Sequence, residues 1–219
     1  MKHSKTFRPD FVEGKFFHLY NRTNDKGLLF REAEDRYLFL RKFSHYLKPF
    51  LTTYAYNLLD THFHAVIKVK SKEECLSYLR TLDKEELIKA EEGFFNSGDI
   101  NKLIDAELQR FFASYAQVFN TTHGRHGNLF QHRFCCPEIE DEAHLFQTIV
   151  YVHANTDKHG ICSFLDYKWS SYPVILNERP GIVDCQAVLK LFGGKEAFEK
   201  FHLENVEYYY SCNTGMDMD

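Results

Sequence analysis

The chain has 219 residues, and its 27 Lys and Arg against 31 Asp and Glu give a formal net charge of −4. Hydrophobic residues make up 44% and charged residues 26%, which is typical of a globular protein and excludes an intrinsically disordered chain. No run of about 18 apolar residues occurs, so no membrane-spanning helix is expected.

The first third of the chain is predicted to form a strand, a helix and a β-hairpin. Lys15–Thr23 alternates aromatic and polar residues, as a half-buried strand does. Glu32–Lys48 has apolar residues at helical spacing. Thr52–Leu59 and Phe63–Lys70 are rich in β-forming residues, and the short Asp60-Thr61 connection between them predicts a hairpin.

The middle of the chain is predicted to be mostly helical. Lys72–Phe95 and Ile100–Asn120 are helical in composition. Residues 121–133 form a loop rich in Gly and His, and a short strand is expected near Phe134–Ile139. Asp141 can cap a helix that ends near Asn155.

The order β-α-ββ-α-β-α predicts an α+β fold of the ferredoxin-like type, an antiparallel sheet with helices on one face and one extra helix. Residues 1–175 are expected to form this domain, with a helical insertion at about 71–110. Residues 176–219 are expected to form a helical C-terminal extension. It comprises short helices within Val183–Phe201 and a poorly ordered tail over Glu204–Asp219.

Cysteine usage and charge distribution bear on location and partners. Six cysteines without a secretory signal are expected to be reduced thiols in a cytoplasm, and the lack of C-x-x-C disfavours a zinc ribbon. Residues 1–31 carry seven basic and three acidic groups, whereas 71–110 carry six and ten and 177–219 carry four and eight. The net charge therefore does not decide whether the partner is a polyanion.

The first candidate for chemistry is the pair His62 and His64. On a strand, residues two apart project from one face, so both imidazoles can bind one metal ion while Phe63 points into the core. Two half-buried histidines on a sheet surface would give the same pattern without a metal.

The second candidate is Tyr151 with Asn155, which a helix places on one face about one turn apart. Packing at a helix end is the simpler explanation of this pair taken alone. Together with His62 and His64, an amide oxygen would complete a site for Mg²⁺ or Mn²⁺, although Zn²⁺ also accepts histidines. A tyrosine hydroxyl nearby can attack a phosphodiester held there.

The third candidate is the loop at 121–133, which carries cations and no acid. Its glycines permit close backbone approach, and an aromatic ring there can stack on a base. A surface loop with scattered cations is an equally good interpretation of this segment by itself. We expect DNA contacts from five residues: Arg22, Arg125, His126, Phe130 and Arg133.

Four segments together resemble the single-tyrosine HUH transposases, and the REP-associated tyrosine transposase branch in particular. These segments are His62-Phe63-His64, Phe119–Phe134, Tyr151–Asn155 and Trp169–Tyr172. The resemblance extends from about Phe16 to Tyr172, and the segment that begins at Leu191 is similar to the C-terminal addition of that branch.

The resemblance implies an enzyme that cuts single-stranded DNA beside hairpins through a 5′-phosphotyrosine intermediate, in DNA transposition or repeat-element mobilisation. His62 and His64 match the metal-binding pair, Tyr151 the nucleophile and Asn155 the third metal ligand. The implied cofactor is Mg²⁺ or Mn²⁺, and the implied location is the nucleoid of a bacterial cytoplasm, with no membrane partner. The sequence does not determine the oligomeric state, so a homodimer is neither predicted nor excluded. It also does not identify the general base.

This chain departs from the family at two places. It has Asp60-Thr61 where Pro-Asn often precedes the first histidine, and Thr156 where proline usually follows the asparagine. Two other classes of protein share part of this pattern. Cupins also use H-x-H but with a Glu at the position of Lys68, which disfavours them. A non-catalytic single-stranded nucleic-acid-binding module would explain fold and aromatics but not the co-occurring His, Tyr and Asn.

Overall fold

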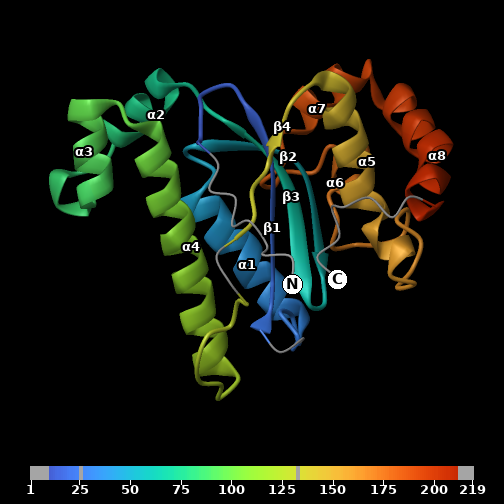
Figure 1. Ribbon diagram of the computed structural model, residues 1–219, viewed down its shortest axis with the longest axis horizontal. Coiled ribbons are helices and arrows are strands. Elements are labelled where there is room, and N and C mark those ends of the chain that lie inside the picture. The colour runs from blue at the N-terminus through green and yellow to red at the C-terminus, as the bar shows by residue number, and fades with distance from the viewer. Residues whose placement is uncertain (1–9, 25–26, 132–133, 212–219) are drawn as a thin grey trace, which may run out of the picture.

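A four-stranded antiparallel sheet lies at the centre of the computed structural model, which describes residues 10–24, 27–131 and 134–211 (Figure 1). Its strands run in the order β2-β3-β1-β4, which is the ferredoxin-like order. They are β1 (Phe16–Arg22), β2 (Leu51–Leu59), β3 (His62–Val69) and β4 (Glu138–Ile139). The expected α+β class and antiparallel sheet are confirmed.

The hairpin of β2 and β3 fixes the register that the site depends on. Leu59 pairs with His62 and Asn57 pairs with His64, so the predicted connection at Asp60 and Thr61 is the hairpin turn. On the other side, β1 pairs with β3 so that Tyr20 lies opposite His64.

The fourth strand is shorter than Phe134–Ile139, the range that the sequence predicts. Tyr20 and Cys135 exchange backbone hydrogen bonds of 2.9 Å in each direction, so this segment does follow β1. Pro137 has no N–H to donate, and only its carbonyl bonds to β1, accepting from the His18 amide at 3.0 Å. Regular pairing is therefore restricted to the last two residues of the predicted run.

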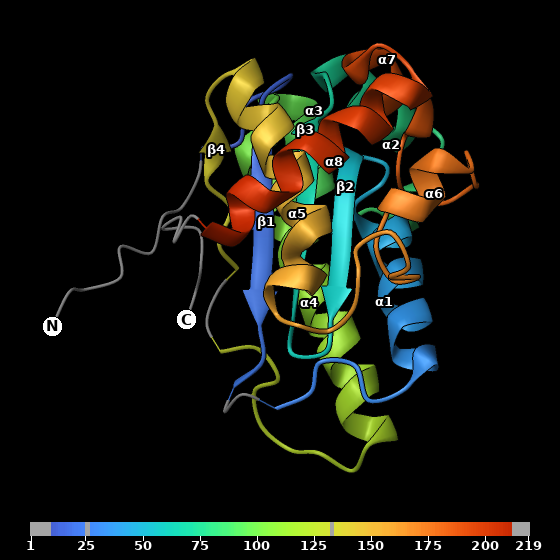
Figure 2. The ribbon, with the colours of Figure 1, turned by 90° about the vertical axis from the view of Figure 1, so that its right-hand side faces the viewer.

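Helices cover both faces of the sheet (Figures 1 and 2). The core helices α1 (Ala33–Tyr46) and α4 (Ile100–Thr122) lie on the face to which Phe63 points, where its ring is 4.8 Å from that of Phe39. Helix α5 (Glu142–Lys158) packs against β2 and β3 on the opposite face. The expectation of helices on one face thus holds for α1 and α4 only. The alternating strands β1 and β3 carry a second, partly polar face, and α5 buries much of it.

The segment inserted between the hairpin and the second core helix comprises α2 (Lys72–Leu79), a 3-10 turn (Lys84–Glu86) and α3 (Lys89–Ser97). Gly98 ends α3 with a left-handed φ of 61°, a conformation that glycine adopts without steric cost. Asp99 then caps α4, its carboxylate accepting from the Lys102 amide at 3.1 Å. The expected insertion therefore ends near residue 99, because α4 is one continuous helix.

The C-terminal part covers α5 and the free edge of β2. Helix α6 (Tyr172–Leu176) follows a segment whose Trp169 carbonyl accepts from the Leu58 amide at 3.1 Å, so this segment pairs with the edge strand. Helices α7 (Cys185–Phe192) and α8 (Lys195–Ser211) come next, and α8 packs along α5 (Figure 2). The expected disorder is wrong for 204–211, which continue α8, while 212–219 lie outside the described residues.

A buried histidine pair joins α8 to α5. The Nδ1 atom of His153 lies 2.8 Å from Nε2 of His202. The Nε2 atom of His153 lies 2.7 Å from the Ser171 hydroxyl oxygen. Burial lowers the pKa of His202 to about 4 and lowers that of His153 well below its usual value.

A search of the described residues for a helix with the length and hydropathy of a membrane span finds none.

Candidate active site

The predicted metal pair projects from one face of β3. His62 and His64 alternate with Phe63, which is fully buried against the core helices. The two imidazole ring centroids lie 5.2 Å apart, with His64 buried and His62 half-buried. The strand period of two therefore puts both side chains where the sequence expects them.

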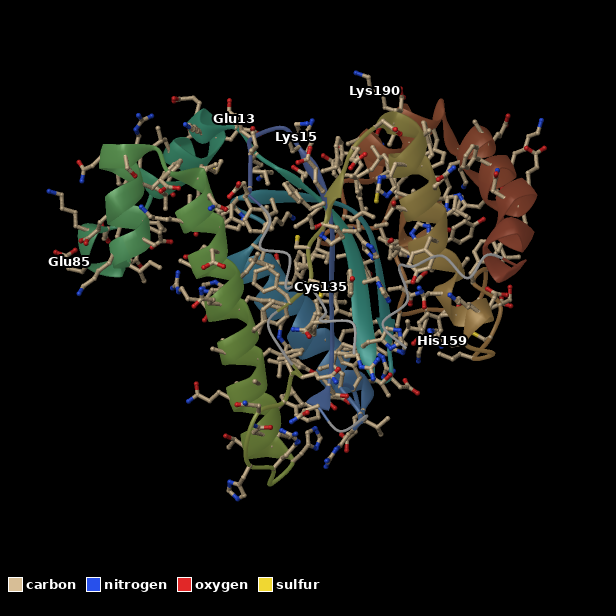
Figure 3. The ribbon with its side chains drawn as sticks, in the orientation of Figure 1. Glu13, Lys15, Glu85, Cys135, His159 and Lys190 are labelled. Atoms are coloured by element: carbon tan, nitrogen blue, oxygen red, sulfur yellow. The ribbon has the colours of Figure 1, made fainter. Side chains whose placement is uncertain are left out.

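Helix α5 runs across these histidines and presents residues at a spacing of four. The Tyr151 ring centroid lies 5.7 Å from that of His64, and two turns later the His159 ring lies 5.0 Å from that of His62. Asn155 lies midway between these two contacts on the same helical face. Figure 3 shows His159 at the end of α5, beside the hairpin end of the sheet. The helix ends three residues later than predicted, so Asn155 is inside the helix.

Asn57 holds α5 against the hairpin. Its side-chain amide donates to the Val152 carbonyl at 2.8 Å and to the His153 carbonyl at 3.3 Å. Asn57 pairs with His64 across the two strands, and it is fully buried. These bonds thus connect the strand beside His62 and His64 to the helix that carries Tyr151.

A histidine that the sequence analysis did not single out lies next to this group. His18 on β1 places its Nε2 atom 3.0 Å from Nδ1 of His64, and both rings are buried. Burial lowers the pKa of His18 to about 3 and also lowers that of His64 well below its usual value. Burial therefore favours the neutral form of both imidazoles, which is the form in which an imidazole can bind a metal.

Asn155 is the residue whose surroundings point most clearly to a ligand. It is 1% exposed, and among the described residues neither its amide oxygen nor its amide nitrogen has a hydrogen-bond partner. A buried unpartnered amide costs about 1–3 kcal/mol and calls for an explanation. An ion bound by its oxygen would supply one.

The donor set can be compared with what divalent ions accept. Over the described residues, no cluster of three or more His, Cys, Asp and Glu side chains is arranged to hold a metal. The residues here that could hold an ion are instead two imidazoles and one amide oxygen, from His62, His64 and Asn155. Such a set leaves coordination positions for phosphate oxygen and water and fits Mn²⁺, Mg²⁺ or Zn²⁺.

Tyr151 itself is enclosed rather than exposed. Only 3% of the residue is accessible, its ring lies edge-on to His18 and His64, and the Lys158 ammonium lies 5.8 Å from its ring centroid. Of the 13 tyrosines in the chain, two others lie near motifs. Tyr115 donates its hydroxyl to the Leu29 carbonyl at 2.7 Å, and Tyr172 stacks on Phe198.

The predicted DNA contacts are spread over the structure. Arg22 ends β1 directly opposite His62, so the two side chains share one face of the sheet. Phe130 is half-buried and packs on Phe112, with ring centroids 4.9 Å apart, so one face of its ring serves the core. Arg133 lies outside the described residues.

The loop after α4 is held by one of the predicted contacts. The guanidinium of Arg125 donates to the Asn128 carbonyl at 2.8 Å and to the Asn120 side chain at 3.2 Å, while His126 is exposed. Arg125 therefore shapes this loop, whatever else it binds.

The sequence reasoning missed four residues of this arrangement, namely His18, Asn57, His159 and Thr61, whose hydroxyl oxygen lies 3.0 Å from Nδ1 of His62. His159 follows Tyr151 by eight residues and Asn155 by four, so helical spacing could have identified it. His18 and Asn57 are brought to His64 only by strand pairing, for which the sequence carries no local signal.

Comparisons with known proteins show a distant structural similarity. Neither a protein family model nor a curated protein matches the chain. A solved structure of a REP-associated tyrosine transposase bound to a REP hairpin is similar, with 14% identity over 78% of this chain and 84% of that one. The TM-score is 0.49, too low to transfer an activity or a residue role.

Proposed function

We propose that this chain is a transposase-like endonuclease and strand transferase that cuts single-stranded DNA next to hairpins. The observation that carries the proposal is that α5 brings Tyr151 and the unpartnered Asn155 against the face of β3 that holds His62 and His64. These are the four residues that match the single-tyrosine HUH pattern in the sequence.

The reaction we propose is a transesterification at phosphorus. The Tyr151 hydroxyl oxygen attacks the scissile phosphate and the bond to the 3′ oxygen breaks. The phenol loses its proton as the new bond forms, and the departing 3′ oxygen takes up a proton to become a hydroxyl. The products are a 5′-phosphotyrosine on the protein and a free 3′-hydroxyl on the other fragment. Since the phosphodiester energy is kept in the tyrosine ester, rejoining needs no nucleotide cofactor.

The chain's own residues divide the remaining tasks. His62, His64 and Asn155 would hold a divalent ion, which when bound polarises the phosphate and offsets developing negative charge. Asn155 would also link the position of the ion to that of Tyr151, one helical turn away. Because Tyr151 is only 3% exposed, we infer that its side chain or what covers it shifts when DNA enters.

Binding of the DNA is assigned to the residues predicted from sequence. Arg22 is well placed for a phosphate next to the histidine pair, because it shares their sheet face at the end of β1. The loop with Arg125, His126, Phe130 and Arg133 would contact the hairpin stem. Phosphate contacts position the DNA without reading its sequence.

The test is covalent capture of DNA by the purified chain. With Mn²⁺ and a single-stranded oligonucleotide that carries a hairpin, the wild type should form a species that migrates as protein plus DNA in denaturing gels. Tyr151→Phe removes only the hydroxyl and should bind the same DNA but form no such species. Tyr172→Phe, also at a buried tyrosine, is the matched control and should react like the wild type.

Two results would contradict the proposal. Capture by Tyr151→Phe at the wild-type level would exclude this nucleophile. Tight binding of the hairpin oligonucleotide by the wild type with no covalent species, with Mn²⁺, Mg²⁺ or Zn²⁺, would favour the non-catalytic nucleic-acid-binding module instead.

A further inference from the structure

We propose that His18 and Thr61 are positioning residues, which direct Nε2 of His64 and Nε2 of His62 toward one bound ion. The inference rests on the proposed function for the metal role of the two histidines. It concerns which ring nitrogen each histidine presents, a property that the sequence motif leaves open.

The first half of the argument is the contact between His18 and His64. Strand β1 pairs with β3, so His18 and His64 lie on the same sheet face, with Tyr20 directly opposite His64. The imidazoles are stacked at an interplanar angle of 24°, and Nε2 of His18 is 3.0 Å from Nδ1 of His64. The Nδ1 atom of His64 is therefore hydrogen-bonded to His18, and Nε2 is the ring nitrogen of His64 that is left to bind an ion.

The second half is an equivalent contact one strand period away. The Nδ1 atom of His62 lies 3.0 Å from the Thr61 hydroxyl oxygen. In both histidines of the pair, then, Nδ1 faces a hydrogen-bond partner within the protein. Two different partners, one from β1 and one from the hairpin turn, produce the same orientation.

The turn that carries Thr61 is itself anchored to the core. Arg36 of α1 forms a short ion pair with Asp60, and its guanidinium lies 5.0 Å from the ring centroid of Phe30 and 5.3 Å from that of Trp169. Arg36 is buried, while the Asp60 side chain is exposed, so the anchor holds the turn through the Arg36 side of the pair. The anchor keeps Thr61 beside His62.

The contacts imply a defined tautomer for each ligand. A ring nitrogen that binds a metal must carry no proton, so the other nitrogen must carry it and donate it to a partner. His64 would donate Nδ1–H to Nε2 of His18, and His62 would donate Nδ1–H to the Thr61 hydroxyl oxygen. Both histidines would then present an unprotonated Nε2 before any ion arrives.

The experiment measures tautomers and metal affinity in the same set of full-length proteins. Long-range ¹⁵N–¹H NMR of the metal-free protein reports which nitrogen of His64 carries the proton. Isothermal titration calorimetry with Mn²⁺ as the only ligand gives the affinity of each protein for the ion. The variants are His18→Leu, which removes the partner, and His18→Gln, whose side-chain oxygen can accept near the position of Nε2.

A matched control is available on the other side of α5. His202→Leu also removes one member of a buried histidine pair, the one with His153, but away from the proposed site. Thr61→Val tests the second contact and keeps the size of the side chain. It also serves if His18→Leu does not fold, because Thr61 is half-buried in a turn.

The expected results are specific. His64 should be protonated at Nδ1 in the wild type and in His18→Gln and shift toward the Nε2–H form in His18→Leu. Mn²⁺ affinity should fall by about 10-fold or more in His18→Leu and in Thr61→Val, as outer partners of metal ligands typically contribute. His18→Gln should recover most of it, and His202→Leu should match the wild type.

Failure of this proposal and failure of the proposed function would look different. Wild-type tautomer and affinity in His18→Leu, or equal loss in His202→Leu, would overturn the positioning role while the metal site stands. A wild type that binds no Mn²⁺ would overturn the metal role itself and, with it, the positioning role.

Discussion

Replacing Asn155 by leucine should stabilise the metal-free protein while destroying its metal affinity. Asn155 is 1% exposed, and both polar atoms of its amide are buried without a partner among the described residues. Leucine has a similar size and carries no group that needs a hydrogen bond. Removing the unpartnered amide should therefore raise the free energy of unfolding by about 1–3 kcal/mol.

The same substitution at Asn57 should have the opposite effect. The amide oxygen of Asn57 is also buried without a partner among the described residues, but its amide nitrogen donates to two carbonyls of α5, at 2.8 and 3.3 Å. Both of these bonds would be lost. The two carbonyls keep their bonds within α5, so the loss is that of two buried hydrogen bonds, and Asn57→Leu should lower the free energy of unfolding by about 1–3 kcal/mol. The two substitutions are chemically identical, which isolates the effect of the environment.

The assay is urea unfolding monitored by circular dichroism. It is done once with a chelator present and once with Mn²⁺ in excess. Ion at 100 times its dissociation constant should stabilise the wild type by about 2.7 kcal/mol and leave Asn155→Leu unchanged. If Asn155→Leu unfolds as easily as Asn57→Leu in chelator, the Asn155 amide has a structural partner, and its assignment as a ligand loses its support.

Three further predictions follow from other parts of the molecule. In fluorescence anisotropy titrations, affinity for hairpin DNA should fall steeply as the salt concentration rises. Arg22→Gln should reduce the slope of log affinity against log salt concentration by about 1, and an unchanged slope would contradict a phosphate contact of Arg22. Burial raises the pKa of Glu107 to about 7 even though Arg110 forms an ion pair with it and Glu91 lies close by. Because the pKa of Glu107 is higher in the folded than in the unfolded chain, its contribution to stability should be complete below about pH 4.5 and lost as the pH rises through 7. Glu107→Gln should flatten the plot of unfolding free energy against pH in this range. An equal slope in the two proteins would refute this prediction. Finally, Tyr115→Phe should lower the melting temperature, since it removes the 2.7 Å bond to the Leu29 carbonyl, yet leave covalent capture of DNA intact.

Local patterns in the sequence were sufficient for much of the site. The strand period placed His62 and His64 on one face, and the helical period placed Tyr151 and Asn155 on one face of α5. These are short-range geometric relations, so they hold whatever the rest of the chain does. The topology also followed, because the order of strands and helices leaves few antiparallel arrangements.

Relations between distant segments could not be predicted in the same way. The contact of His18 with His64 depends on the register of β1 against β3, and the anchoring bonds of Asn57 depend on how α5 packs. The tail from Glu204 was expected to be poorly ordered, yet α8 continues to Ser211, and the helix packs on α5. Tertiary packing of this kind decides helix length more than composition does.

The most direct test of the proposed mechanism is to identify the atom that holds the DNA. The covalent species formed by the wild type with Mn²⁺ and hairpin DNA can be digested with protease and nuclease, and the modified peptide sequenced by mass spectrometry. A nucleotide joined through its 5′-phosphate to Tyr151, with a free 3′-hydroxyl on the released fragment, is the predicted result. A phosphate on any other residue, or a 3′-phosphate linkage, would contradict it.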